Sequence, residues 1–381
     1  MKKINLVIYG ATGSIGGSVL SIVRCNKKKF NVQGVTCNKN YNKLIKIAEE
    51  FDVKKLGINK RIKSEIKKLK KYHVYEDISS FSNICDKKTD VIIFAISGLA
   101  GLDLIHKLCK IGKTIGMANK ECIISIGQNL TKLAKKNCSI IVPLDSEHNS
   151  IYHLLNNNHG PFESITITAS GGPFRKLPLK SFNNISVKQA LSHPIWKMGK
   201  KISIDSATMV NKALEIIEAK YLFNLKDSQI DAIIHPQALI HAMVNYKNGV
   251  TTALLNKPDM RIPISSLFFK FNDYANKTKE LNLLEYSKLE FHAINIKRYP
   301  AIKLGKEVMK IGGLAPNAFN YLNEILVSYF LKGVIKFPDI TALNEINLEN
   351  IFAKNSNIMN PNLIDIKNLN NWIDNNIQLK Y

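Results

Sequence analysis

Apolar and polar positions follow two different periods over the first 143 residues. Short apolar runs with the length of strands lie at 4–9, 31–37, 91–96, 113–117 and 139–143. Between them, apolar residues recur with the spacing of an amphipathic helix near 14–25, 41–51, 61–71, 101–111 and 122–136. Because strands that alternate with helices form parallel sheets, we expect an α/β, Rossmann-like doubly wound domain over residues 1–145.

The pattern changes after residue 155. A turn-rich break at 156–161 precedes an alternating strand at 164–169, and a short strand at Lys201 is expected to lead into a helix that reaches Ala219. Further short strands and a helix follow up to residue 269, so we expect a central α+β domain over 146–269. Residues 270–298 resemble a linker, and a C-terminal α-helical domain (299–381) is predicted to contain helices at 301–312, 316–332, 342–353 and 366–376.

Residues 174–200 form a long connection with little helical periodicity. A connection of this length is usually a lid or a disordered segment. This one contains His193-Pro194-Ile195-Trp196 and Met198. Since a tryptophan beside a methionine is unusual in a passive linker, the composition favours a lid that closes over a ligand.

Composition indicates a globular protein of the cytoplasm. The chain is 45% hydrophobic and 22% charged, and no apolar run approaches the roughly 20 residues of a membrane span. The first predicted strand starts at Ile4, which leaves no room for a targeting peptide ahead of the fold. The six cysteines form no C-x-x-C pair, as expected of packing residues in a reducing compartment.

A strongly basic balance raises the question of a nucleic-acid partner. The chain has 54 Lys and Arg against 30 Asp and Glu, a net charge of +24. The lysines are dispersed, however, and the densest run, 61–71, carries no aromatic residues that could stack on bases. We therefore expect a small-molecule substrate and no nucleic acid, with anionic ligands and surface composition accounting for the charge.

A glycine-rich turn follows the first predicted strand. Gly10, Gly13 and Gly16 stand between that strand and a helix, where glycine lets the backbone approach a pyrophosphate at the helix N-terminus. The second strand ends in Thr36-Cys37-Asn38-Lys39-Asn40, without the acid that usually binds the ribose of NAD. A cation and amides suit a 2′-phosphate and favour NADPH; the alternative is that they are ordinary polar loop residues.

Two carboxylates, Asp145 and Glu147, follow the strand at 139–143. Strands of an open α/β sheet present chemistry at their C-terminal ends, and converging carboxylates suit a hard divalent cation. Lys120, at the end of the 113–117 strand, should lie on the same sheet edge as the two acids, where its ammonium group could bind the substrate. The alternative for an isolated pair of acids is a solvated strand end.

A second polar set begins beyond residue 169. Ser170 opens a Gly-Gly turn with exposed N–H groups, and Ser206, Asn211 and Lys212 supply a hydroxyl, an amide and an ammonium able to hold a phosphate. Glu215 lies three residues after Lys212 on the same helical face. By itself this segment would equally fit an amphipathic helix with a charged outer face.

Together these motifs resemble the 1-deoxy-D-xylulose 5-phosphate reductoisomerase family. The resemblance rests on GATGSIG at 10–16, ANKE at 118–121, PLDSEHNSI at 143–151, TASGGPF at 168–174, HPIWKMGKKISIDSATMVNKALEIIEA at 193–219, IHPQALIH at 234–241 and KPDMRIPI at 257–264. It covers the first two thirds closely. The departure inside a motif is Ile195, where the family usually has a small polar residue.

The resemblance implies an NADP-dependent oxidoreductase of the non-mevalonate isoprenoid pathway that converts the phosphosugar 1-deoxy-D-xylulose 5-phosphate to 2-C-methyl-D-erythritol 4-phosphate. It implies a homodimer that uses NADPH and Mg²⁺ or Mn²⁺, with Co²⁺ as an alternative, and support for the site from Glu218 and His241. Catalysis would involve Lys120, Asp145, Glu147 and Glu215, of which the three acids would be metal ligands. Substrate would contact Ser146, Glu147, Ser170, His193, Trp196, Met198, Ser206, Asn211, Lys212 and Glu215. NADPH would contact Thr12, Gly13, Ser14, Ile15, Asn38, Lys39, Asn40, Asn119, Glu121 and Gly199.

The nearest rival is another NADP-dependent dehydrogenase with the same plan, such as a semialdehyde or homoserine dehydrogenase. A semialdehyde dehydrogenase needs an activated cysteine in its second domain, and no cysteine follows Cys138. The rival from another class is a basic nucleic-acid-binding protein, which predicts salt-sensitive binding to nucleic acid and no metal-dependent NADPH oxidation.

Overall fold

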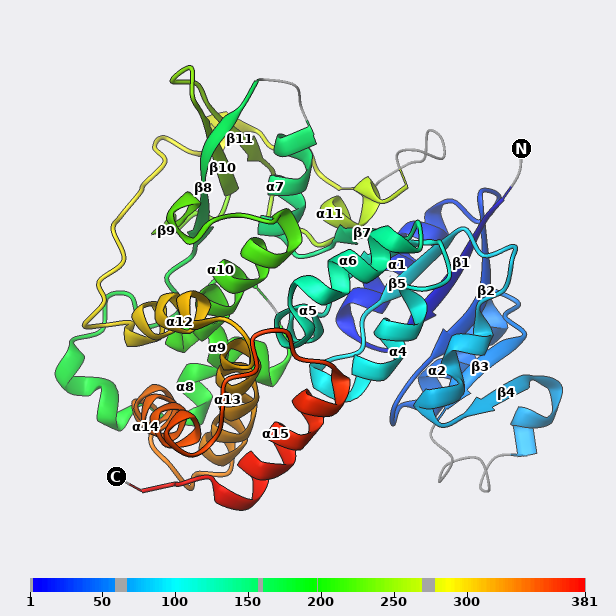
Figure 1. Cartoon of the computed structure of the whole chain (residues 1–381). Coiled ribbons are helices and arrows are strands. Elements are labelled where there is room, and N and C mark those ends of the chain that lie inside the picture. The colour runs from blue at the N-terminus through cyan, green and yellow to red at the C-terminus, as the bar shows by residue number, and fades with distance from the viewer. Residues whose placement is uncertain (1–2, 59–66, 157–159, 197, 269–277, 381) are drawn as a thin grey trace. The chain divides into compact units, whose positions relative to one another are not determined.

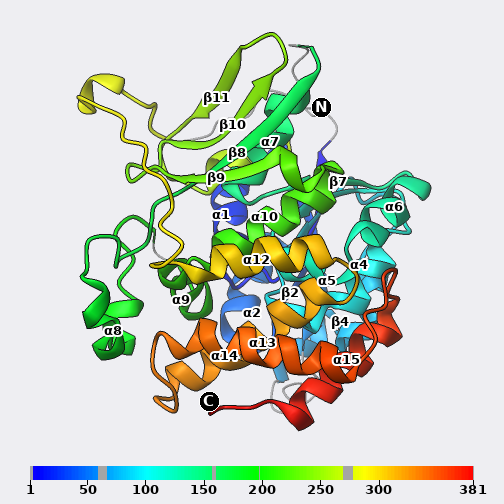
Figure 2. The ribbon, with the colours of Figure 1, turned by 60° about the vertical axis from the view of Figure 1, so that its left-hand side comes forward.

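The computed structural model describes residues 3–58, 67–156, 160–196, 198–268 and 278–380, which group into two compact units. The first unit comprises Met1–Cys122, Leu130–Asn149 and Asp259–Lys279. The second comprises Ile123–Asn129, Ser150–Pro258 and Glu280–Tyr381. Figures 1 and 2 show the chain in two views.

The first unit is built on a seven-stranded parallel sheet of order β4-β3-β2-β1-β5-β6-β7. Its strands are β1 (Ile4–Tyr9), β2 (Phe30–Thr36), β3 (Lys55–Ile58), β4 (His73–Glu76), β5 (Val91–Phe94), β6 (Thr114–Met117) and β7 (Ile140–Pro143). β1 pairs with β2 on one side and with β5 on the other, so the strand order reverses beside β1. Ligands of open α/β sheets bind at such a reversal, outside the carboxyl ends of the strands.

Helices connect these strands, as the alternating pattern predicted (Figure 1). They are α1 (Ser14–Cys25), α2 (Tyr41–Glu50), α4 (Leu102–Leu108), α5 (Lys120–Ile126) and α6 (Gln128–Lys136). Helix α7 (Ser146–Asn156) follows β7, and α11 (Arg261–Ser266) returns to the first unit; parts of α5, α6 and α7 belong to the second unit. All four residues of β5 are buried, as are Val19, Leu20 and Val23 on one face of α1. This burial explains why the central strands are continuously apolar and why the helices are amphipathic.

The second unit combines a mixed four-stranded sheet with C-terminal helices. The sheet has the order β11-β10-β8-β9, in which β8 and β9 are parallel and β10 runs antiparallel to β8 and β11. Its strands are β8 (Phe162–Ala169), β9 (Ile230–Ile234), β10 (Ile240–Tyr246) and β11 (Thr251–Leu255). The helices are α8 (Val187–Ala190), α9 (Lys200–Thr208), α10 (Val210–Phe223), α12 (Pro300–Ile311), α13 (Ala315–Leu331), α14 (Asp339–Lys354) and α15 (Leu363–Asn376). The α/β sheet, the α+β sheet and the helical C-terminus were all predicted, and the structure confirms them.

Several local predictions need correction. The short strand expected at Lys201 is wrong, because these residues form helix α9, in which Lys201 pairs with Asp205 one turn later. The helix expected over 122–136 is two helices separated by Gly127, whose φ of +64° ends α5. Strands β3 and β4 were not predicted. In the connection 174–200, a 3₁₀ helix (Leu179–Asn184) and α8 occur where little periodicity was found.

Other predictions fall partly outside the described residues. Of the helix expected at 61–71, residues 61–66 lie outside them and Lys67–Lys71 form a 3₁₀ turn. Of the linker expected at 270–298, residues 270–277 lie outside them, and the rest contains a 3₁₀ turn at Leu283–Glu285 and a bridge between His292 and Ile234. Among the helices that the structure describes, none is long and apolar enough to cross a membrane.

Helices α10 and α12 run side by side in both views (Figures 1 and 2), and their close approach depends on Gly305. A Cβ atom at Gly305 would lie 2.6 Å from the Ala213 Cβ and 3.2 Å from its Cα. The backbones of the two helices therefore pack with no room for a larger residue at this point.

We predict that Gly305→Ala destabilises the protein by about 1–3 kcal/mol, because the added methyl group forces α12 away from α10. Gly17→Ala is the matched control, since Gly17 also lies in a helix and a Cβ there meets nothing within 4 Å. The control should be neutral or more stable by up to about 1 kcal/mol. Urea unfolding measures both, and equal midpoints for the two variants would contradict the packing argument.

Candidate active site

The turn after β1 brings its backbone very close to the end of β5. Gly10 has a φ of +85°, and a Cβ there would lie 2.3 Å from the Ala95 carbonyl oxygen. A Cβ at Gly16 would lie 2.6 Å from the Ala11 Cα, so the first turn of α1 also packs against the loop. Side chains are thus excluded where a pyrophosphate would meet the N-terminus of α1, which begins after Gly13. The predicted cofactor residues Thr12, Gly13, Ser14 and Ile15 occupy this helix start, half-buried or exposed.

The loop after β2 lies beside this turn. Asn38, Lys39 and Asn40 are exposed, and the Asn40 side chain caps α2 by accepting a hydrogen bond from the Lys43 amide at 3.1 Å. Lys43 Nζ donates to the Thr12 carbonyl oxygen at 2.9 Å, which joins the two loops. Sequence reasoning missed Lys43, because its role depends on the distance between loops that are far apart along the chain.

Asn119 fixes the ends of β5 and β6 relative to each other. Its buried side-chain amide donates to the Ile96 and Gly98 carbonyl oxygens, the second at 2.7 Å, and its oxygen accepts from the Cys122 amide. Glu121 follows in the first turn of α5, half-buried. Asn119 therefore shapes the sheet edge whether or not it also contacts a cofactor.

At the end of β7, Asp145 pairs with Lys120, as their shared sheet edge predicted. Lys120 Nζ lies 2.6 Å from Asp145 Oδ2, and its side chain is only 9% exposed. Burial alone would raise the pKa of Asp145, but the charges of Lys120 and of His148 outweigh burial and hold that pKa well below its usual range. Asp145 is consequently an ionised oxygen donor at neutral pH.

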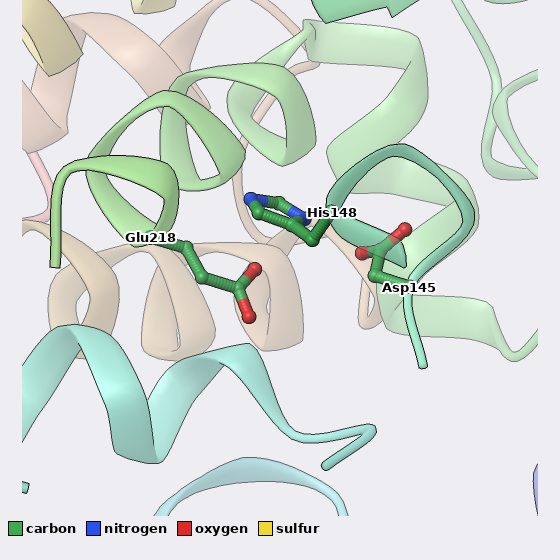
Figure 3. Close-up of side chains that lie close together, drawn as sticks. All are labelled: Asp145, His148 and Glu218. Carbon is green, nitrogen blue, oxygen red and sulfur yellow. The ribbon is translucent and has the colours of Figure 1, made fainter. Parts of the chain in front are cut away.

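The first turn of α7 carries the neighbouring groups. Ser146 Oγ lies 2.6 Å from Glu147 Oε2, and the Asp145 carbonyl accepts from the Asn149 amide at 2.8 Å, so Asp145 occupies the helix N-cap. Figure 3 labels Asp145 and the fully buried His148, which follows it at the start of α7. His148 was not among the predicted site residues, although its position three residues after a helix cap indicated that it would share a face with Asp145.

In the second unit, the turn after β8 places Ser170 beside His193. Ser170 Oγ lies 3.2 Å from His193 Nε2 and accepts from the Gly172 amide at 3.3 Å. His193 Nδ1 accepts from the Ile195 and Trp196 amides at 3.2 and 2.9 Å. Since Nδ1 is an acceptor, the neutral ring carries its proton on Nε2 and can donate it to Ser170 or to a ligand oxygen.

Helices α9 and α10 meet at Met209, whose φ of +63° breaks the helical backbone. The break places Ser206 near the end of α9 and gives α10 its own N-terminus, at which Asn211 and Lys212 lie. A Cβ at Gly172 would lie 2.8 Å from the Ser206 carbonyl oxygen, so the Ser170 turn backs directly onto α9. We call Ser170, His193, Ser206, Asn211 and Lys212 the polar cluster of the second unit.

Glu215 lies one turn along α10 from this helix start. Both Asn211 Nδ2 and Lys212 Nζ donate to its carboxylate, and Lys212 and Glu215 are nearly inaccessible to solvent, at 3% and 1% exposed. Glu218 follows on the same helix, also buried (Figure 3). The predicted grouping of Lys212 and Glu215 on one helical face is therefore confirmed, and the face is buried rather than solvated.

The end of the predicted lid contacts β10. The Trp196 ring centroid is 6.4 Å from that of His241, and His241 Nε2 lies 3.1 Å from the Asn256 side-chain amide. Met198 is half-buried. Gly199 is exposed and is the N-cap of α9, and the Gly199 carbonyl oxygen accepts a hydrogen bond from Ser203 Oγ at 3.0 Å. These contacts order the segment that follows His193.

A parallel sheet with a glycine turn at its strand-order reversal is the fold of the dinucleotide-binding oxidoreductases. Comparison with known proteins then identifies the family. Models described as 1-deoxy-D-xylulose 5-phosphate reductoisomerase, as its C-terminal domain and as DXP reductoisomerase C-terminal domain match residues 6–127, 141–223 and 255–375. The chain belongs to the 1-deoxy-D-xylulose 5-phosphate reductoisomerase family.

Full-length relatives support this membership. The reductoisomerase of Pelagibacter ubique is 42% identical, with 98% of each chain covered, and that of Wolbachia pipientis is 38% identical, with 94% of this chain and 92% of the relative covered. A crystal structure of DOX-P reductoisomerase with NADPH, fosmidomycin and magnesium has a TM-score of 0.89 at 31% identity, covering 98% of this chain and 97% of that one. The Zymomonas mobilis enzyme with NADPH has a TM-score of 0.89 at 32% identity, covering 97% of each chain.

We predict that His193 stays neutral well below pH 6 in the ligand-free protein. Burial disfavours the imidazolium and lowers the pKa of His193 to about 4. The ring titrates near 6.5 in the unfolded chain. As the pH falls from about 6.5 towards 4, the unfolded chain therefore takes up a proton that the folded protein does not, and the free energy of unfolding decreases. NMR titration of the His193 ring checks this, with the exposed His73 as a comparison in the same spectra; a His193 midpoint above pH 6 would contradict it.

Proposed function

We propose that Asp145, Glu147 and Glu215 together hold the divalent cation for the family's reaction. Membership in the family assigns that reaction: isomerisation and reduction of 1-deoxy-D-xylulose 5-phosphate to 2-C-methyl-D-erythritol 4-phosphate, with NADPH and a divalent metal. The observation that carries the residue assignment is that Asp145 and Glu215 each form an ion pair with a buried lysine, Lys120 and Lys212 respectively.

The donor set fits the proposed metal. Three carboxylates supply the hard oxygen ligands that Mg²⁺ and Mn²⁺ bind, with Co²⁺ as an alternative. A related reductoisomerase has been crystallised with magnesium, which agrees with this choice. When bound, the cation would polarise the substrate carbonyl and lower the pKa of the neighbouring hydroxyl.

The cofactor side fits NADPH. The glycine turn leaves the backbone around Gly13 open to a pyrophosphate, and the exposed Asn38 and Lys39 suit a 2′-phosphate. The remaining proposed contacts are Thr12, Ser14, Ile15, Asn40, Asn119, Glu121 and Gly199. Two related reductoisomerases were solved with NADPH, which supports this cofactor.

The polar cluster of the second unit would anchor the substrate phosphate. The N-terminus of α10 offers backbone N–H groups, and Lys212 and the hydroxyls of Ser170 and Ser206 add charge and donors. His193 would donate from Nε2, while Trp196 and Met198 would cover the substrate as a lid. Phosphate binding far from the reacting carbons can then be used to fix the reacting end.

The remaining residues orient the reacting end. Lys120 and Ser146 would bind the substrate oxygens near Asp145, and closing of the lid would exclude water from reactive intermediates. By the route favoured for the family, a carbon–carbon bond is cleaved in a retro-aldol step and re-formed in an aldol step. The resulting aldehyde accepts hydride from NADPH and a proton, which gives the alcohol product and NADP⁺.

Three wider assignments complete the proposal. The protein would act as a homodimer in the cytoplasm. Residues 1–145 would bind NADPH, 146–269 would carry metal, substrate and lid, 270–298 would link, and 299–381 would form the helical domain. Support for this division comes from the glycine turn in the first of these ranges and the polar cluster in the second.

The assay that tests the function is NADPH oxidation followed at 340 nm. We expect turnover only when 1-deoxy-D-xylulose 5-phosphate and Mg²⁺ or Mn²⁺ are both present, because the cation activates the carbonyl and NADPH supplies the hydride. Omitting substrate, or removing metal with a chelator, should each abolish the signal. Folded protein that binds NADPH and still shows no turnover would refute the assignment.

We further predict that Glu215→Gln raises the metal concentration for half-maximal activity by at least about tenfold, because a neutral amide replaces a charged ligand. NADPH affinity, measured by fluorescence titration, should change less than twofold. Glu307→Gln is the control, since Glu307 lies on the exposed face of α12 in an ion pair with Lys303. A metal titration identical to that of the control would remove Glu215 from the ligand set.

A further inference from the structure

The turn that carries Ser170 is held in an unusual backbone conformation. It begins directly after β8, and Gly171 and Gly172 have φ values of +83° and +65°. Glycine has little intrinsic preference among backbone conformations, so a Gly-Gly sequence does not by itself fix these two left-handed φ values. Contacts from elsewhere in the chain must therefore select this conformation.

Tyr299 supplies the first of these contacts. Its hydroxyl donates to the Gly171 carbonyl oxygen at 2.7 Å, and the residue is 1% exposed. Burial raises the pKa of Tyr299 to about 12, so the phenol remains a proton donor throughout the working pH range. The bond acts on the peptide next to Ser170.

Arg298 supplies the second contact, a few residues further along the same segment. Its Nη1 donates to the Phe174 carbonyl at 2.8 Å and to the Leu177 carbonyl at 2.6 Å. The guanidinium also lies 5.5 Å from the centroid of the Phe182 ring. One side chain thus binds both ends of the tight turn in which the Leu177 amide donates to the Phe174 carbonyl.

The segment that bears both residues is itself fixed against α10. Tyr299 is the N-cap of α12, and α12 packs on α10 through Gly305 and Ala213. Helix α10 begins at Val210 and carries Asn211 and Lys212, the other side of the polar cluster, in its first turn. Tyr299 at the start of α12 therefore contacts the Ser170 turn, while Gly305, further along the same helix, contacts the helix that completes the cluster.

We infer that Tyr299 and Arg298 are positioning residues for the substrate phosphate, which hold Ser170 in register with the N-terminus of α10. The inference rests on the proposed function, in which the polar cluster anchors that phosphate. Neither residue needs to touch the substrate. Their effect passes through the Gly171 and Phe174 peptides to the Ser170 hydroxyl and amide.

Tyr299→Phe tests the inference, with Tyr246→Phe as the matched control. Tyr246 lies on β10, and its buried hydroxyl likewise donates to a backbone carbonyl, that of Leu154, at 2.9 Å. Both variants lose one such bond, so their melting temperatures should fall by similar amounts. Only Tyr299→Phe should raise the KM for 1-deoxy-D-xylulose 5-phosphate, by roughly fivefold, with kcat and the KM for NADPH within about twofold of wild type.

Arg298→Lys is a second test that keeps the positive charge. A single ammonium cannot reproduce the flat guanidinium that lies over Phe182 while its Nη1 bridges two carbonyls, so the substrate KM should rise by roughly tenfold. A substrate KM in both Tyr299→Phe and Arg298→Lys equal to that of Tyr246→Phe would overturn the inference. A rise in the NADPH KM as large as the rise in the substrate KM would also overturn it, because the effect would then be general.

A binding measurement separates this inference from the proposed function. Inorganic phosphate is titrated into each variant, and the Ser170–Gly172 amide resonances are followed by NMR. A fivefold weaker Kd in Tyr299→Phe than in Tyr246→Phe supports the positioning role even if wild type shows no reductoisomerase turnover, a result that would refute only the function. Equal phosphate affinities in the two variants would overturn the inference.

Discussion

Two ion pairs, each between a buried lysine and a carboxylate, are the interactions on which the proposed metal site depends. Lys120 pairs with Asp145 in the first unit, and Lys212 pairs with Glu215 in the second. A carboxylate withdrawn from water without a partner takes up a proton, and it then loses the charge that binds a cation. At Asp145 the charge of Lys120 outweighs burial and holds the pKa below its usual range, so this acid stays charged. At Glu215 the ion pair with Lys212 offsets the cost of burying the carboxylate.

The backbone departs from regular structure at several residues of the proposed ligand sites. Gly10, Gly171 and Gly172 adopt left-handed conformations, and so does Met209, which has a side chain and gains no such freedom. Met209 divides what would otherwise be one long helix and so creates the N-terminus of α10 at Val210, directly before Asn211. The first N–H group of this helix, that of Val210, donates a hydrogen bond to Thr208 Oγ1 at 3.3 Å. N–H groups at a helix start have no intrahelical partners, so the break at Met209 creates a helix terminus of the kind that the proposed phosphate site requires.

Local patterns predicted the elements whose periodicity is set by their own burial. All four residues of β5 are buried, as are five of the six residues of β1, and both strands are largely apolar, while the C-terminal helices show a 3.6-residue period. The residues from Lys201 to Ile204 misled the prediction, because an alternation of polar residues with Ile202 and Ile204 fits a strand as well as a helix with buried polar positions. Ser203 and Asp205 are in fact buried there, Ser203 on the Gly199 carbonyl and Asp205 on Asn323. The short strands β3 and β4 were missed because four residues carry too little periodicity.

The residues of the candidate site differ in the same way. The pairing of Lys120 with Asp145 and of Lys212 with Glu215 was predictable, because each pair belongs to short motifs at one sheet edge or on one helical face. The support of the Ser170 turn was not, since Tyr299 lies 128 residues from Gly171 along the chain and stands in no pattern that marks it as polar in function. A loop with binding residues has few hydrogen bonds of its own to fix its conformation, because its backbone has left the sheet in order to face the ligand. Its geometry must come from a remote segment, and phosphate binding can orient the reacting carbons only as accurately as that segment holds the loop.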